Sequence, residues 1–284
     1  MISDMIPDMI KDMIKKINKR IVFYIVFAVF ILGFFLYLRF PGYVVEKFII
    51  AGLSERYPET FISLQSVSLS FPPGLKLENV IFGFKDNREA NFRIEQFRVR
   101  PRFLGYIYGR SSFLVNVLAY DGAIKGFVNF PLFFAKKAPE KAEVSFENLD
   151  IEKCAYLRDK LGRRIAGRLG GAFTYDGYGN DGKLNFYIQK GSYQLLENTF
   201  GFEKLDFNNI DGQVGLKNGA FKISKLTLKG DKISYFLKGD ILLNPELKNS
   251  VINLSGTVEI ATLNNKKMKM LITGTIGNAI TEYL

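Results

Sequence analysis

The stretch Lys232-Ile-Ser-Tyr-Phe-Leu-Lys-Gly-Asp-Ile-Leu-Leu243 contains the residue pattern from which the fold is predicted. It contains the apolar residues Ile233, Tyr235, Leu237, Ile241 and Leu243, and Lys232, Ser234, Lys238 and Asp240 interleave with them. Apolar residues repeat every second position in a β-strand that has one apolar and one polar face. The stretch therefore predicts a strand, and the same alternation continues through most of the chain beyond residue 60.

We expect a mainly β protein built as an elongated, curled antiparallel meander with a few short helices. Further strands are predicted at 61–71, 75–84, 91–100, 111–119, 123–130, 143–149, 165–175, 182–190, 213–217, 219–229, 252–260 and 268–272. Turns are predicted at four dipeptides that readily adopt positive φ: Asp121-Gly122, Asp181-Gly182, Asp211-Gly212 and Asn218-Gly219. Short helices are predicted at 43–56, 101–108 and 151–161. The second half has no long helix to cover an apolar face, so the sheet must fold on itself, pair with another chain or hold an apolar ligand.

Residues 21–38 read IVFYIVFAVFILGFFLYL and contain no charge. As a helix they span roughly 27 Å, close to the thickness of a bilayer core. A cleaved signal peptide is the alternative, but its apolar region is shorter and ends in small residues, whereas this one ends in Arg39-Phe40-Pro41. We expect a transmembrane anchor with these anchor residues: Ile21, Phe23, Phe27, Phe30, Leu32, Phe35 and Leu38.

Charges beside the anchor predict its orientation. Five Lys or Arg residues lie in the ten positions before residue 21, and two lie in the ten positions after residue 38. The positive-inside rule then keeps the N-terminus in the cytoplasm and places the bulk in the periplasm, with the chain in the inner membrane. The net charge is +11, and residues 1–20 carry only +2 of it. Membrane lipids or acidic envelope proteins are therefore the expected partners, and nucleic acid is not.

The chain is expected to divide into five segments. Residues 1–20 have apolar positions at helical spacing, which fits an interfacial or docking helix and equally fits an extension of the anchor. The anchor covers 21–38, and a first half-sheet at 39–134 begins with a short capping helix. A polar linker at 135–142 leads to the second half-sheet at 143–284.

Composition disfavours an enzyme. The chain has no histidine and one cysteine, Cys154, so it lacks a Ser-His-Asp triad, a Cys-His pair and the usual zinc ligands. No phosphate-binding or metalloprotease motif is present, and the carboxylates form no convincing pair. The Gly-rich stretch at 175–182 is interpreted as a hairpin loop. We expect no catalytic residues, no metal and no cofactor.

Arginine supplies the candidate binding residues. Guanidinium groups pair well with lipid phosphates and with carboxylates of an acidic partner, although arginines also occupy ordinary solvated strand faces. The candidate contacts are Arg98, Arg100, Arg102, Arg163 and Arg164. Several phenylalanines suit either a groove for acyl chains or an ordinary core: Phe82, Phe84, Phe92, Phe127, Phe130, Phe133 and Phe134.

Several stretches resemble one family in order and spacing. They are FPPGLKLENV at 71–80, FRVRP at 97–101 with Leu104 and Gly109-Arg110, YDGAIKGFV at 120–128, GRLGGAFTY at 167–175 and GDILLNPELKNS at 239–250. Together they resemble the type II secretion system protein N-like proteins, within the broader group of AsmA-like envelope proteins. Residues 1–20 are not part of the resemblance.

The resemblance implies a single-pass inner-membrane protein with a periplasmic β-sheet and no catalytic residues. It implies a component of type II protein secretion. AsmA-like relatives imply an alternative, in which lipids pass between the inner and outer membranes along a hydrophobic groove.

Overall fold

The computed structural model describes residues 19–87, 90–102, 110–131, 139–161, 164–199, 202–217, 220–244, 249–261 and 266–284. The chain divides into two compact units, Met1–Val44 and Val45–Leu284. The first unit contains helix α2, Lys19–Leu38, and helix α3, Gly42–Arg56, begins near the boundary. Several predicted features lie outside the described residues: residues 1–18 of the N-terminal segment, most of the helix at 101–108, residues 135–138 of the linker, and the residues Phe133, Phe134 and Arg163.

Helix α2 exposes apolar side chains on every side. The exposed fractions of Phe23, Phe30 and Leu32 are 66%, 70% and 62%. Phe23 and Phe27, one helical turn apart, stack with ring centroids 6.3 Å apart. Within the described part of the chain, no helix qualifies as a membrane span by length and hydropathy.

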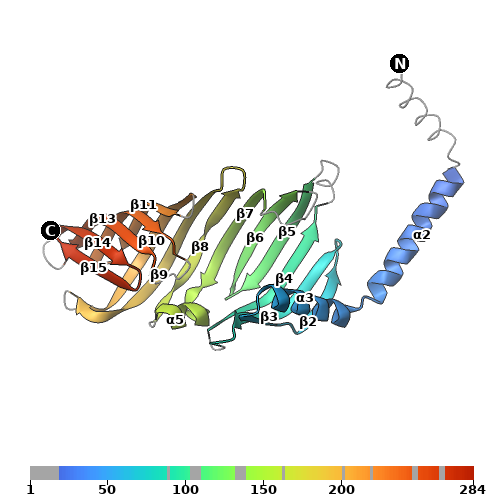
Figure 1. Ribbon diagram of the computed structural model, residues 1–284, viewed down its shortest axis with the longest axis horizontal. Helices are drawn as coiled ribbons and strands as arrows, with labels where there is room; N and C mark the ends of the chain where they lie inside the picture. Colours follow the sequence, from blue (N-terminus) through green and yellow to red (C-terminus); the bar gives the residue numbers. More distant parts are fainter. Residues whose placement is uncertain are drawn as a thin grey trace, which may run out of the picture. The chain divides into compact units, whose positions relative to one another are not determined.

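The second unit is dominated by one antiparallel sheet of 15 strands (Figure 1). The strands are β1 Thr60–Ser63, β2 Ser66–Ser70, β3 Gly74–Phe84, β4 Asn91–Pro101, β5 Arg110–Ala119, β6 Gly122–Pro131, β7 Lys141–Asp150, β8 Ile165–Asp176, β9 Asp181–Thr199, β10 Phe202–Lys217, β11 Ala220–Lys229, β12 Ile233–Leu242, β13 Val251–Ile260, β14 Lys266–Thr275 and β15 Asn278–Tyr283. From β3 to β15 each strand pairs with the next in the chain, and β1 and β2 both pair with β3. The prediction of a mainly β antiparallel meander is confirmed.

Two short helical segments follow β7. The 3-10 helix η1, Ile151–Lys153, is capped by the Asp150 carboxylate, which accepts a hydrogen bond from the backbone N–H of Glu152 at 3.2 Å. Helix α5, Ala155–Leu161, places Tyr156 against Phe92 of β4, with ring centroids 4.5 Å apart. Phe82 and Phe84 of β3 join the same aromatic cluster, so three of the predicted groove phenylalanines pack under α5.

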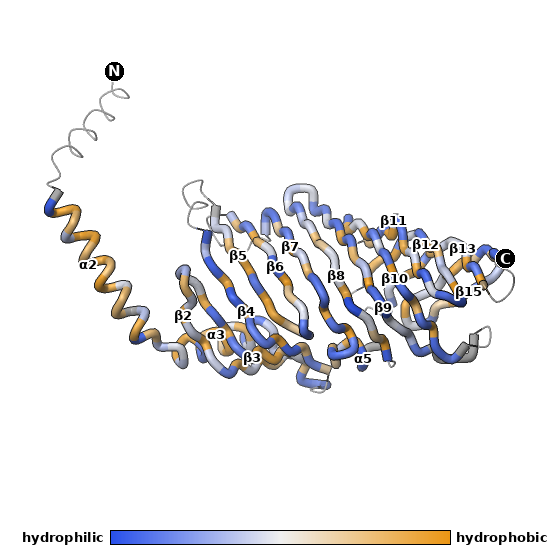
Figure 2. Tube along the Cα trace, turned by 180° about the vertical axis from the view of Figure 1, so that it is seen from behind, coloured by the Kyte–Doolittle hydropathy of each residue, from blue (hydrophilic) through white to orange (hydrophobic). Residues whose placement is uncertain are grey.

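Cross-strand pairing sorts the side chains into two faces. One row of paired residues, here called the apolar row, crosses the sheet from β2 to β14. Its members are Leu69, Leu75, Val99, Val115, Gly126, Val144, Phe173, Leu184, Val214, Ile223, Gly239, Leu254 and Ile272. The adjacent row on the opposite face, here called the polar row, contains Lys76, Arg98, Asn116, Lys125, Ser145, Ala172, Asn185, Gln213 and Lys225. The alternation is visible as changing hydropathy along each strand (Figure 2).

Two expectations about shape and length were wrong. The sheet is not strongly curled. Alternation defines which face is apolar, but curvature depends on strand twist and bulges, which alternation does not encode. The predicted strand at 61–71 is two strands, because the chain breaks pairing at Leu64-Gln65 and the N–H of Gln65 donates to the carbonyl of Glu78 at 3.1 Å. Strands β9 and β10 are also longer than predicted, and β15 was missed.

Of the three predicted turn dipeptides that lie in the described residues, one overlaps an observed hairpin turn. The β5–β6 hairpin turns at Tyr120 and Asp121, whose φ angles are 53° and 60°, one residue before the predicted dipeptide. Asp181 and Gly182 begin β9, after a loop at 177–180. Asp211 and Gly212 lie inside β10 and form no turn. Asn218-Gly219 lies outside the described residues.

Candidate functional site

The apolar face of the sheet is the first candidate surface. Most members of the apolar row are half-buried, and Ile223 and Leu254 are buried at 8% exposure. The described helices of the second unit are α3, η1 and α5, of 15, 3 and 7 residues. Helices of this length cannot form a layer over a sheet whose strands lie about 4.8 Å apart across 15 positions.

The tightest packing on this face lies near its C-terminal strands. Ile233, Val258 and Ile260 are exposed by 3%, 0% and 1% and form a buried cluster. Leu205, Leu228, Tyr235 and Met268 pack against it. Burial raises the pKa of the Tyr235 hydroxyl to about 12, because ionisation in an apolar setting is unfavourable. This end of the face is therefore a true core. Val67, Leu77 and Val117, near the other end of the sheet, are also buried on this face, whereas most of the apolar row between is half-buried.

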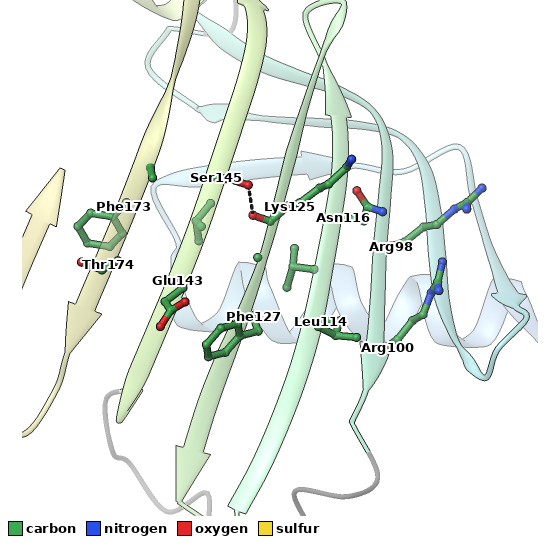
Figure 3. Close-up of a pocket in the computed structure, with 14 residues that line it drawn as sticks. Arg98, Arg100, Leu114, Asn116, Lys125, Phe127, Glu143, Ser145, Phe173 and Thr174 are labelled. Atoms are coloured by element: carbon green, nitrogen blue, oxygen red, sulfur yellow. Dashed lines mark hydrogen bonds between the residues drawn. The ribbon is translucent and has the colours of Figure 1, made fainter. Parts of the chain in front are cut away.

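A hollow of about 490 Å³ lies across strands β4 to β8, and most of its lining side chains belong to the polar face (Figure 3). Arg98 and Arg100 of β4 line one side of it, and Lys125 of β6 lies beyond Asn116 of β5. Leu114 and Phe127 are paired neighbours in its middle. A second hollow of about 520 Å³ shares Ala172 with it and is lined by more polar residues, including Asp211 and Lys225.

The five predicted arginine contacts do not form one site. Arg98 and Arg100 are brought together in the polar-face hollow. Arg102 is exposed beyond the end of β4, where its backbone N–H donates to the carbonyl of Ser112 at 2.8 Å. Arg164 lines a separate hollow of about 130 Å³ with Glu152 and Arg158. Arg163 lies outside the described residues.

Sequence reasoning missed Lys125 and Leu114 as members of the hollow. Phe127 was noticed only as one of several phenylalanines that suit an acyl-chain groove. The missing signal is the hairpin register: the two-residue turn at Tyr120-Asp121 pairs Asn116 with Lys125 and Leu114 with Phe127. Once that turn is known, alternation places these residues on the face that carries Arg98 and Arg100.

Several charged groups of the described residues form surface ion pairs. Lys76 hydrogen-bonds Glu78 and is the largest cause that lowers the pKa of that carboxyl; Ser66 donates to the same group at 2.9 Å. Lys153 pairs with Asp121 at 2.6 Å and lowers the pKa of that carboxyl. Burial raises the pKa of the Tyr120 hydroxyl to about 12, and that oxygen accepts a hydrogen bond from the backbone N–H of Arg93 at 3.1 Å.

The described part of the chain contains no cluster of three or more Cys, Asp or Glu side chains that is suited to a metal ion. Cys154 is buried beside η1. The described geometry thus offers two surfaces, the apolar face and the polar-face hollow.

Comparison with protein-family models, curated proteins and solved structures finds no match for this chain.

Proposed function

We propose that this chain is a non-enzymatic envelope transport protein that holds acyl chains of lipids along the apolar face of its sheet. The observation that supports this proposal is the apolar row, which continues from β2 to β14 without a charged residue. A broad uncovered apolar surface marks a site for lipid, membrane or a protein partner. A path one or two side chains wide and many strands long suits extended hydrocarbon chains.

The proposal places the chain in the inner membrane, with α2 as its anchor and the sheet in the periplasm. Its support is the uncharged sequence of 21–38, the exposure of the described apolar side chains of α2, and the excess of Lys and Arg before the span. The proposed lipid-facing residues are the seven named from the sequence.

A component of type II protein secretion is the second candidate. Its support is the resemblance of residues 71–80, 97–101 and 120–128 to that family. These segments lie on β3, on β4 and on the β5–β6 hairpin, near one end of the sheet. In the secretion candidate the apolar face binds another envelope protein, whereas in the lipid candidate it binds acyl chains.

The lipid proposal predicts that phospholipid copurifies with the full chain after extraction in a neutral detergent. Leu184→Lys places a charge on the apolar row between Phe173 and Val214. Asn185→Lys places the same charge on the polar row, one residue along β9. Copurified lipid, counted by mass spectrometry per protein, should fall about fivefold or more in Leu184→Lys, because desolvating a charge beside an acyl chain is costly. It should stay unchanged in Asn185→Lys.

Equal lipid content in the two variants would contradict the lipid proposal. If the parent chain carries no lipid and exported enzymes remain in the periplasm of a deletion strain, the secretion candidate replaces it.

A further inference from the structure

Three cationic side chains in the polar-face hollow form no ion pair with any carboxylate that the structure describes. Within the described residues, Arg98, Arg100 and Lys125 form no ion pair, and the buried Nε of Arg98 has no hydrogen-bond acceptor. The Glu78 carboxylate interacts with Arg98 only by longer-range electrostatics, and it already accepts a hydrogen bond from Lys76. The hollow therefore carries positive charge that no ion pair among the described residues neutralises.

The one carboxylate that lines the hollow is already engaged. Glu143 of β7 forms an ion pair with Lys141 at 2.7 Å. The same Lys141 Nζ lies 5.8 Å from the centroid of the Phe127 ring. Glu143 lies at the side of the hollow away from Arg98 and Arg100 (Figure 3), so it does not oppose an anion at the arginines.

Apolar side chains continue from the cations across the hollow. Cross-strand pairing places Arg100 beside Leu114, and Leu114 beside Phe127. Leu114 is 42% exposed, which is high for a leucine inside a sheet. Arg100 and Phe127 are two strands apart, roughly 10 Å. The surface thus passes from guanidinium to aliphatic to aromatic within the length of a short acyl chain.

We propose that this hollow binds an anionic amphiphile, with its carboxylate or phosphate headgroup on Arg98, Arg100 and Lys125 and its acyl chain over Leu114 and Phe127. The guanidinium group of arginine can form paired hydrogen bonds with either a carboxylate or a phosphate headgroup. The volume of about 490 Å³ lies within the range of small-molecule sites. A free inorganic anion would leave Leu114 and Phe127 unused, so the amphiphile fits the whole lining better. This site lies on the face opposite the apolar row and does not depend on the proposed function.

The chain contains no tryptophan, so one substitution introduces a unique fluorophore. Phe127→Trp reports from the hollow, and Leu114→Trp is a second reporter should the first fail to fold. The full chain in dodecyl maltoside is titrated with dibromostearate, an anionic fatty acid whose bromines quench tryptophan on contact. We expect saturable quenching, and the Kd should rise about tenfold or more when Arg98→Gln and Arg100→Gln are combined. Arg102→Gln, on an exposed arginine outside the hollow, should leave the Kd unchanged.

Two control probes identify the ligand class. The neutral methyl ester of dibromostearate should quench the tryptophan of the Phe127→Trp variant only weakly. Inorganic phosphate alone should neither shift the emission of that variant nor displace the fatty acid at millimolar concentration. A Phe221→Trp variant reports from the apolar face and should be quenched by acid and ester alike if that face holds acyl chains. The two faces are thereby tested separately.

The proposal is overturned if dibromostearate leaves the Phe127→Trp variant unquenched, or if adding the two arginine substitutions does not change the Kd. Displacement by inorganic phosphate would overturn it in favour of a simple anion site. Tighter binding of a deca-glutamate peptide than of the fatty acid would overturn it in favour of an acidic protein partner.

Discussion

Gly212 shows how a single residue sets the packing of the sheet. It lies inside β10, opposite Phe186 of β9 and Leu226 of β11. A Cβ at this position would lie 2.2 Å from Cε1 of Phe186, so the phenylalanine ring occupies the space above the glycine backbone. Glycine inside a strand commonly marks such a close approach. The Phe186 ring therefore packs directly against the backbone of Gly212, and a side chain at position 212 would block this contact.

Gly212→Ala should therefore lower stability by about 1 to 3 kcal/mol, because the new methyl must displace the ring. Gly215→Ala is the matched control on the same strand, since the nearest atom to its added Cβ is a carbonyl oxygen at 3.9 Å. Thermal unfolding of the full chain, followed by circular dichroism in neutral detergent, measures both. Combining Gly212→Ala with Phe186→Leu should recover part of the loss. If the two alanine variants unfold at the same temperature, the packing of Phe186 against residue 212 does not contribute to stability.

At the scale of the elements, each strand is stabilised by the strands on either side of it. Extensive contacts among the described residues join strands that are adjacent in the sheet, with α5 and η1 as the added contacts on β4 and β8. Val258 of β13 is fully buried among residues of β10 to β14. Such an arrangement is similar to that of a repeat protein, in which stability is local and spreads through neighbours.

Val258→Ala should speed hydrogen exchange in β12, β13 and β14 while leaving β3 to β5 unchanged. Removing two buried methyl groups costs about 2 kcal/mol, and few direct contacts carry that loss to distant strands. Val117→Ala, 6% exposed in β5, is the reciprocal control and should affect β4 to β6. Exchange that accelerates equally in all strands after either change would show that the sheet unfolds as one cooperative unit.

Strand positions could be predicted because alternation is a local property. Residues 233–241 and 252–260 carry it plainly, and the observed β12 and β13 agree with it. The turn dipeptides were less informative, since Asp211-Gly212 serves ring packing inside β10 while the tight hairpin uses Tyr120-Asp121. Likewise, Arg98 and Arg100 of β4 could be named as candidate contacts from the sequence. Lys125 could not, because it lies near them only through the pairing of β4, β5 and β6. Register and curvature are long-range properties that periodicity does not encode.

At the scale of the whole chain, the proposed topology separates a short charged segment from a large sheet. The net charge is +11, of which the first 20 residues contribute +2, so most of the positive excess would lie on the exported side. Exported domains translocate largely regardless of their charge, and the Lys and Arg residues beside the span decide the orientation.

An alkaline phosphatase reporter fused after Leu284 should be active, because that enzyme requires an oxidising compartment. Replacing Lys15, Lys16, Lys19 and Arg20 by Gln should reduce this activity by removing the retained positive cluster. A β-galactosidase fusion at the same position is the opposite control and should be inactive. Reporter activities with the reverse pattern would place the sheet in the cytoplasm and remove the basis for an envelope role.

The strand order of the sheet has a further consequence for how this protein can change. Because β3 to β15 follow one another in space as they do along the chain, a two-strand hairpin can be added or lost without rerouting any connection. Each such event would alter the width of the sheet by about 9.6 Å, two strand spacings. The apolar row would lengthen or shorten by two positions at the same time. The number of hairpins therefore sets the distance over which the sheet carries an apolar path, and that distance can change in steps while the fold stays the same.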